Sequence, residues 1–349
     1  MNKIVLIRNG FDLAHDLKTR YNDFILWYLC KILPSIITKP SFEDTLIKTT
    51  NTKPKTTYSM ITTIKEFRNL PKEYPDLVIE YKYSFFEGLI KQFGKSNWVD
   101  LESPYYSQLL ILYRKLEKAN LDSNSFITSE LEKLNVCFET LKQLLIEYLQ
   151  TINAHEIELN EDIKNHFITH IKRRSNVIDH EILFLTFNYT STLEAYTDKL
   201  FELGTYTINY IHGQLQGNNN PIIFGYGDEM DLYYQKIERL NNNEFLKYIK
   251  SFSYFKTNNY QDFSRFLDLG VFSVYIMGHS CGISDRILLN SIFEHINCRE
   301  IRIFYHKKSE TENDFFEKTQ EISRHFKANR KADMRKMIVP FSNCTPLTN

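Results

Sequence analysis

A histidine and an asparagine each mark the end of an apolar run that is typical of a buried strand. Asn188 ends the run EILFLTFN, and His212 follows YTINYI and precedes Gly213. Imidazole titrates near neutral pH, so His212 suits a general base, while the amide of Asn188 can orient a water molecule or a hydroxyl group. Taken singly, each residue also fits a structural role, because asparagine often caps a helix and a lone histidine is often a buried polar side chain. The pair alone leaves both interpretations open.

A second segment combines glycine with polar side chains. Asn9, Gly10, Phe11 and Asp12 follow the apolar run KIVLI. A strand that leads through Asn-Gly into a helix can present backbone N–H groups to a phosphate. The segment is not a complete GxGxxG, and Asp12 fits an ordinary helix cap as well, so it predicts a nucleotide site only weakly.

A third segment, Gly278-His-Ser-Cys-Gly, matches the GxSxG nucleophile elbow of serine hydrolases. In an elbow the helix starts at the serine, but the capping pair Ser284 and Asp285 predicts a later start. We therefore expect that Ser280 is not a nucleophile.

These segments need a scaffold that brings them together. Helical patterns lie between or after five apolar runs, and this alternation indicates an α/β domain with a mostly parallel sheet. Ligands of such sheets bind at the carboxyl ends of the strands. We therefore expect Gly10, Asn188, His212 and Ser280 to converge at one edge. The five predicted strands are residues 3–7, 181–188, 206–211, 271–277 and 301–306.

The stretch between the first two predicted strands is far longer than a simple βα crossover needs. Its apolar residues recur at helical spacing, as at Leu131, Leu134 and Phe138. Residues 35–57 lack any such periodicity and are predicted to form a mobile loop, as is the tail from Phe341. The predicted parts are a nucleotide-binding domain (1–30 with 176–310), a mainly helical insertion or lid (31–175), and a C-terminal helix and tail (311–349).

Composition excludes several classes of protein. The 349 residues include 43 basic and 43 acidic side chains, so the chain lacks the cationic field of a dedicated DNA-wrapping protein. Its five cysteines lack CxxC spacing, and we expect neither a disulfide framework nor a metal site. No apolar run is long enough for a signal peptide or a membrane span, so we expect a cytoplasmic protein.

Taken together and in order, five segments resemble the bacteriophage abortive-infection AbiH family. They are RNGFDLAHDLKTRYNDF, NWVDLESPYY, LTFNYTSTLE, YIHGQL with IIFGYGDEMD, and MGHSCGISD. The resemblance spans roughly Ile4 to His306. That family is in turn similar to sirtuin-like NAD-binding domains, in which a glycine-rich first loop, a Thr-x-Asn segment, a His-Gly pair and a Gly-x-Ser loop follow in the same order.

The resemblance implies a Rossmann-like (sirtuin-like) parallel sheet and an anti-phage protein that hydrolyses NAD, its substrate, to nicotinamide and ADP-ribose. It implies that Asn188 and His212 are catalytic. Two positions depart from the pattern. Arg8 stands where the family usually has its first glycine, so it either crowds a pyrophosphate or binds it through charge, and Thr190 replaces the sirtuin aspartate. The residues implied to bind the nucleotide are Asn9, Gly10, Phe11, Asp12, Thr186, Gly213, Gly278, Ser280 and Asp285.

Other functions stay open. One alternative is a nucleotide-binding sensor without catalysis, which Arg8 favours slightly and in which the helical insertion relays occupancy to a partner. Another is a ribonuclease or other toxin with its active groups in the helical part, and a serine hydrolase acting through Ser280 is the least expected. The expected partners are NAD or a related nucleotide and a phage-derived trigger or partner protein, but neither a membrane nor sequence-specific DNA. A homo-oligomer stays open.

Overall fold

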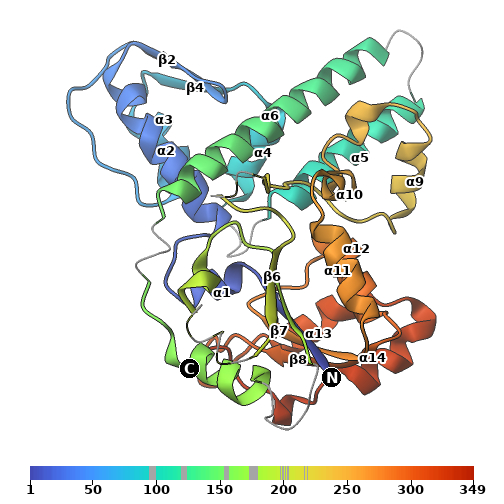
Figure 1. Cartoon of the computed structure of the whole chain (residues 1–349). Coiled ribbons are helices and arrows are strands. Elements are labelled where there is room, and N and C mark those ends of the chain that lie inside the picture. The colour runs from blue at the N-terminus through green and yellow to red at the C-terminus, as the bar shows by residue number, and fades with distance from the viewer. Residues whose placement is uncertain are drawn as a thin grey trace. The chain divides into compact units, whose positions relative to one another are not determined.

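The computed structural model describes residues 1–93, 100–118, 124–152, 157–172, 180–196, 198, 200, 202, 204–215, 217 and 219–349. The first residues of the NWVDLESPYY segment and the predicted domain boundary at 175–176 lie outside this range. The chain divides into two compact units (Figure 1). Unit 1 consists of Met1–Lys18, Ile152–Asp231 and Ile249–Asn349, and unit 2 consists of Thr19–Thr151 and Leu232–Tyr248.

Unit 1 is built on a five-stranded parallel sheet in the order β6-β5-β1-β7-β8. The chain runs from the central strand β1 outward to β5 and β6, then crosses to the other side for β7 and β8. This corresponds to the doubly wound order 3-2-1-4-5, whose switch point lies between the first and fourth strands. The predicted α/β fold with a parallel sheet is confirmed. The strands are β1 (Asn2–Ile7), β5 (Ile182–Thr186), β6 (Tyr206–Tyr210), β7 (Phe272–Met277) and β8 (Cys298–Phe304).

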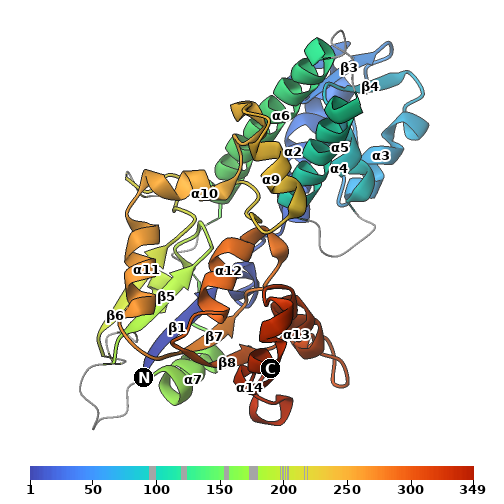
Figure 2. The ribbon, with the colours of Figure 1, turned by 90° about the vertical axis from the view of Figure 1, so that its right-hand side faces the viewer.

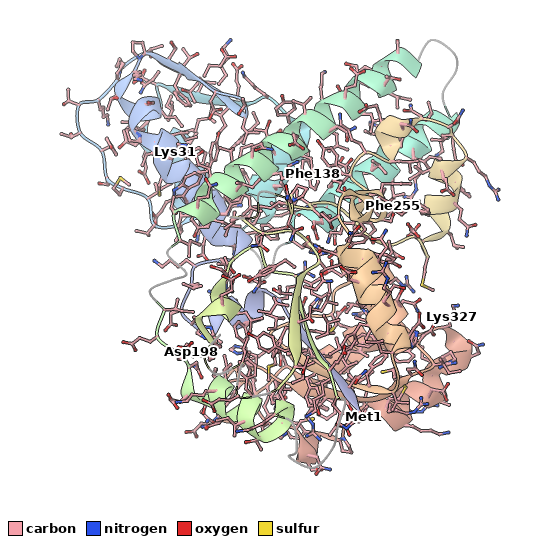
Figure 3. All side chains as sticks on the ribbon, in the orientation of Figure 1. Met1, Lys31, Phe138, Asp198, Phe255 and Lys327 are labelled. Atoms are coloured by element: carbon pink, nitrogen blue, oxygen red, sulfur yellow. The ribbon has the colours of Figure 1, made fainter. Side chains whose placement is uncertain are left out.

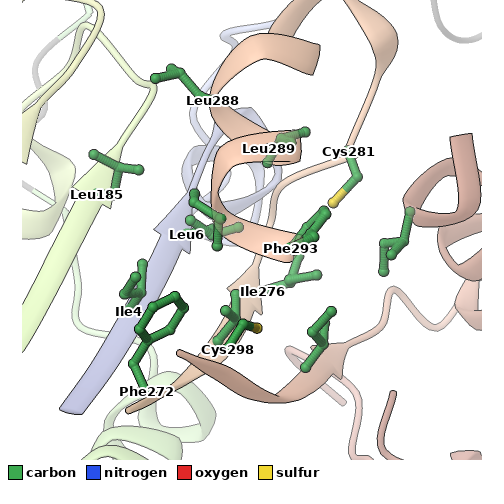
Figure 4. Close-up of a cluster of buried hydrophobic side chains, with 14 of the residues drawn as sticks. Ile4, Leu6, Leu185, Phe272, Ile276, Cys281, Leu288, Leu289, Phe293 and Cys298 are labelled. Atoms are coloured by element: carbon green, nitrogen blue, oxygen red, sulfur yellow. The ribbon is translucent and has the colours of Figure 1, made fainter. Parts of the chain in front are cut away.

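Both faces of this sheet are buried. In β1, Ile4 and Leu6 join one hydrophobic cluster, while Val5 and Ile7 join another, as the alternation of side chains along a strand requires. Helices α11 (Asn259–Asp268; Figure 2) and α12 (Arg286–Phe293; Figures 2 and 4) pack on the first cluster, and α7 (Glu161–His166) packs on the second. Continuous apolar runs such as KIVLI are expected of strands buried on both faces.

The helical elements of unit 1 are short. They are α1 (Asn9–Leu13), α7 (Glu161–His166), the π-helix η3 (Phe167–Ile171), η4 (Thr192–Tyr196), α10 (Lys250–Ser253), η6 (Tyr254–Lys256), α11 (Asn259–Asp268), η7 (Ile283–Asp285), α12 (Arg286–Phe293), α13 (Phe315–Arg324), η8 (Ala328–Arg330), α14 (Lys331–Met337) and η9 (Phe341–Asn343).

Unit 2 is mainly helical, and its core lies around α6. Phe138 on α6 (Figure 3) stacks on Tyr105 with ring centroids 4.1 Å apart, and Tyr248 contacts the edge of both rings. The elements are α2 (Tyr21–Thr38), β2 (Ser41–Glu43), β3 (Ile47–Asn51), α3 (Ile64–Glu73), β4 (Leu77–Tyr81), α4 (Ser84–Gln92), α5 (Glu102–Lys118), α6 (Asn124–Gln150), α9 (Leu232–Glu238) and η5 (Asn243–Phe245).

The prediction of a mobile loop at residues 35–57 is wrong. Part of this segment forms β2 and β3 of a three-stranded antiparallel sheet with β4. Ile47, Thr49 and Asn51 point inward and are buried, while the residues between them face outward. Threonine and asparagine occupy inward positions here, which hid the two-residue period of a strand.

The tail from Phe341 is ordered as well, contrary to the prediction. Cys344 and Leu347 are buried, and His166 Nε2 donates a hydrogen bond of 2.9 Å to the carbonyl of Pro346. Among the described helices, none combines the length and the apolar character that a membrane crossing requires.

Candidate functional site

The carboxyl ends of four neighbouring strands meet at one edge of the sheet in unit 1. Ile7 at the end of β1 is in register with Thr186 of β5 and with Met277 of β7, and Thr186 is in register with Tyr210 of β6. The ends of these strands and the segments that follow them carry the site residues predicted from the sequence. The switch point of the sheet lies between β1 and β7, at the same edge.

A buried carboxyl group lies just after β1. Asp12, only 2% exposed, accepts hydrogen bonds from Asn188 Nδ2 at 3.0 Å and from Thr190 Oγ1 at 2.8 Å. The hydroxyl of Thr192 donates in turn to that of Thr190. Burial raises the pKa of Asp12 to about 6, although its hydrogen bonds act in the opposite direction. The amide of Asn188 is thus held by Asp12, and the carboxyl group titrates close to neutral pH.

The resemblance led us to expect an aspartate at position 190, and the structure gives Thr190 a different role. An aspartate in place of Thr190 would bring a second carboxylate against Asp12, and two such groups repel when both are ionised. The Thr190 hydroxyl donates a hydrogen bond instead.

A second buried carboxylate, Asp285, lies after β7 and is the centre of a group of basic side chains. Arg8 donates to Oδ2, and Lys250 Nζ lies 2.7 Å from Oδ1. His212 Nε2 is 3.5 Å from Oδ1, and His279 Nε2 is 3.8 Å from Oδ2. Buried charges need such partners, because desolvation of an unpaired ion is costly.

Burial favours the neutral form of both histidines beside Asp285. Burial lowers the pKa of His212 and of His279 well below the ordinary value, and the nearby Arg8 and Lys250 act in the same direction. His279 Nδ1 accepts a hydrogen bond of 2.8 Å from the backbone N–H of Cys281. The neutral ring of His279 therefore carries its proton on Nε2.

The two glycines of the first and third segments pack against each other. The N–H of Gly10 donates to the carbonyl of Gly278 at 2.9 Å, and a Cβ on Gly10 would lie 2.6 Å from that oxygen. Gly278 has a φ of +77°, and a Cβ there would lie 2.1 Å from the backbone nitrogen of Phe11. Close packing of two loops thus explains both glycines without a ligand, and the Gly10 amide is engaged within the protein.

A model of the family described as bacteriophage abortive infection AbiH matches residues 4–307. The chain belongs to the AbiH family. This membership supports an anti-phage abortive-infection role, and the matched residues include both buried carboxylates and their partners. No curated protein matches the chain.

The remaining predicted positions of this AbiH protein have varied surroundings. Phe11 is part of a hydrophobic cluster, and Thr186 Oγ1 accepts a hydrogen bond from the backbone of Asn188. Gly213 lies buried in the turn after β6, while Asn9 is half-buried. Phe11 and Thr186 therefore have structural roles whether or not a nucleotide binds.

The loop after β7 lacks elbow geometry at Ser280. The left-handed backbone conformations of this loop belong to Gly278 and to Cys281, which has a φ of 57°, and not to the half-buried serine. Cys281 is buried in the hydrophobic cluster of Figure 4, and burial raises the pKa of its thiol to about 12. The first helical turn starts at Ile283, after the serine. Ser280 therefore lacks the strained turn on which an elbow nucleophile sits.

Sequence reasoning missed two of the side chains that surround Asp285 in this AbiH protein. Lys250 is only 1% exposed although its segment, YIKSF, carries no motif. His279 offered a signal, since it follows a buried strand by two positions, as His212 does. The GxSxG motif in the same segment instead points to Ser280.

Proposed function

We propose that this AbiH protein acts in anti-phage defence by hydrolysing the bond between nicotinamide and ribose in NAD. The observation that carries the proposal is the Asp12 carboxyl group at the carboxyl edge of the sheet, held by Asn188 and Thr190, with a pKa of about 6. Perturbed carboxyl groups at such an edge are favoured candidates for catalysis.

The reaction breaks the bond between ribose C1′ and the nicotinamide ring nitrogen. The bonding electrons leave with nicotinamide and neutralise its ring charge, while positive charge develops on the ribose. An ionised Asp12 stabilises that charge, because Asn188 and Thr190 fix the carboxylate in advance. Water then adds to C1′ and loses a proton, and His212, which is neutral, accepts it. The products are nicotinamide and ADP-ribose.

The basic side chains suit the pyrophosphate of the substrate. Arg8 and Lys250 both contact Asp285, so two cations share this carboxylate. The Arg8 side chain is 16% exposed, whereas those of Lys250 and Asp285 are fully buried. Of these two cations, Arg8 is therefore the one that an anionic ligand can reach from solvent.

The test uses the whole chain in cells and in solution. Wild type should release nicotinamide from NAD, detected by chromatography, and cellular NAD should fall during infection. Asp12→Asn should lower nicotinamide release by about 100-fold or more, as expected for a lost electrostatic contact to the transition state. Asp16→Asn is the matched control, since Asp16 is exposed and asparagine tolerates its φ of 57°. Phage protection with constant cellular NAD would refute the proposal.

A second candidate is a nucleotide-binding sensor without catalysis. The burial of both proposed catalytic groups favours it, because Asp12 and His212 are each only 2% exposed. In that case NAD would bind without being consumed, and His212→Gln would keep phage protection. Substitutions that abolish nucleotide binding would remove it.

A further inference from the structure

Two cations share the buried carboxylate Asp285, and they differ in how easily they can leave it. Lys250 is fully buried and contacts Oδ1 at 2.7 Å, so separating this buried cation from the carboxylate is costly. Arg8 contacts Oδ2, and its side chain keeps 16% exposure. Arg8 is therefore the partner that can exchange Asp285 for another anion at the lower cost.

A replacement donor is already aimed at the oxygen that Arg8 occupies. His279 Nε2 is fully buried, lies 3.8 Å from Asp285 Oδ2, and has no hydrogen-bond partner in the described part of the chain. Its other nitrogen accepts from Cys281, so Nε2 carries the proton. Departure of Arg8 would let this N–H satisfy Oδ2.

We infer that Arg8 is an exchangeable phosphate-binding residue, which a nucleotide phosphate draws away from Asp285 while His279 Nε2 takes its place on Oδ2. Lys250 keeps Oδ1 throughout, so the carboxylate stays compensated. The inference rests on the proposed function for the class of ligand and names the group that recognises it.

Phosphate is the anion that this position favours. Arg8 follows β1 at the switch point of the sheet, where doubly wound folds bind nucleotide phosphates. A guanidinium group can hold phosphate oxygens through two parallel hydrogen bonds. Because Gly278 already engages the amide of Gly10, charge at Arg8 substitutes here for a backbone cradle.

The first test compares ADP with adenosine by isothermal titration calorimetry on the whole chain. Wild type should bind ADP about tenfold or more tightly than adenosine, as a charge-assisted pair predicts. Arg8→Gln should bring the two affinities within about threefold. Arg8→Lys keeps the charge but loses the two parallel N–H donors of the guanidinium group, so it should give an intermediate ratio of affinities. Arg265→Gln is the control, since Arg265 pairs with Asp262 on the surface. An unchanged ratio in both Arg8 variants would overturn the inference.

The second test follows the imidazole proton of His279 by NMR on protein with ¹⁵N-labelled histidine. Addition of ADP should shift its Nε2–H downfield as the hydrogen bond to Asp285 forms, and Arg8→Gln should abolish the response to ADP. ADP binding through Arg8 without this shift would overturn the exchange.

The two tests also separate this inference from the proposed function, because ADP lacks the bond that is cleaved. ADP binding through Arg8 in a protein that never releases nicotinamide would leave the inference standing and refute hydrolysis. Nicotinamide release with equal ADP affinity in wild type and Arg8→Gln would support hydrolysis and refute the inference about Arg8.

Discussion

Replacing Asp12 with asparagine should stabilise the protein at neutral pH. Burial raises the pKa of this carboxyl group from 3.8 to about 6. The folded state therefore holds the proton more tightly than the unfolded state does. Stability from this group is fully present below about pH 4 and is lost as the pH rises through about 6. With about 1.4 kcal/mol for each pKa unit, ionised Asp12 costs about 3 kcal/mol at pH 7.

Urea unfolding of the whole chain between pH 4 and pH 8, followed by circular dichroism, measures this cost. The difference in unfolding free energy between Asp12→Asn and wild type should grow by about 2.4 kcal/mol from pH 4 to pH 7, because pH 4 already lies slightly above the unfolded pKa. Asp16→Asn should show no such growth, because Asp16 is exposed. A difference that stays flat with pH, or a variant that becomes less stable than wild type at pH 7, would refute the reasoning. It would mean that the hydrogen bonds from Asn188 and Thr190 outweigh burial.

Three further substitutions probe the same edge of the sheet. Lys250→Met should lower the free energy of unfolding, measured in urea, by about 3 kcal/mol or more, because Asp285 then has one cation fewer. An unchanged free energy would show that Arg8 alone compensates Asp285. Gly278→Ala should lower the unfolding free energy by more than about 2 kcal/mol through strain at positive φ. The control Gly88→Ala lies in open space on α4 and should be neutral or slightly stabilising. Equal effects of the two substitutions would contradict the argument from the packing of the two loops. Thr190→Asp should lose stability steeply above about pH 6, since it places two carboxylates together, whereas Thr190→Ser should follow the wild-type pH profile.

The sheet of unit 1 could be predicted because its strands are buried on both faces. Such strands are continuous apolar runs, and KIVLI or VFSVYIM stands out in any sequence. The small sheet of unit 2 could not, because Thr49 and Asn51 occupy buried positions in β3. Asn51 is tolerated there since its amide donates to the carbonyls of α2, a contact that no local pattern reveals.

The sequence predicts which side chains lie at this edge of the sheet, but not the electrostatics around them. Strand ends placed Asp12, Asn188 and His212 at one edge, since parallel strands share their direction. The partners of each side chain depend on contacts between residues far apart in the sequence. Lys250 appears in the sequence as an ordinary surface lysine, and only its approach to Asp285 explains its burial.

Arg8, where the resemblance led us to expect glycine, and Thr190, where it led us to expect aspartate, change the charge of this edge in the same direction. Arg8 in place of glycine adds a cation at the end of β1, and Asp285 compensates it from the loop after β7. Thr190 in place of aspartate removes an anion beside Asp12 and supplies a donor instead. Compared with glycine and aspartate, Arg8 adds a positive charge and Thr190 removes a negative one, which under the proposed function would favour an anionic ligand. Arg8 and Thr190 therefore alter how a nucleotide would be held at this edge, and neither argues against a nucleotide site.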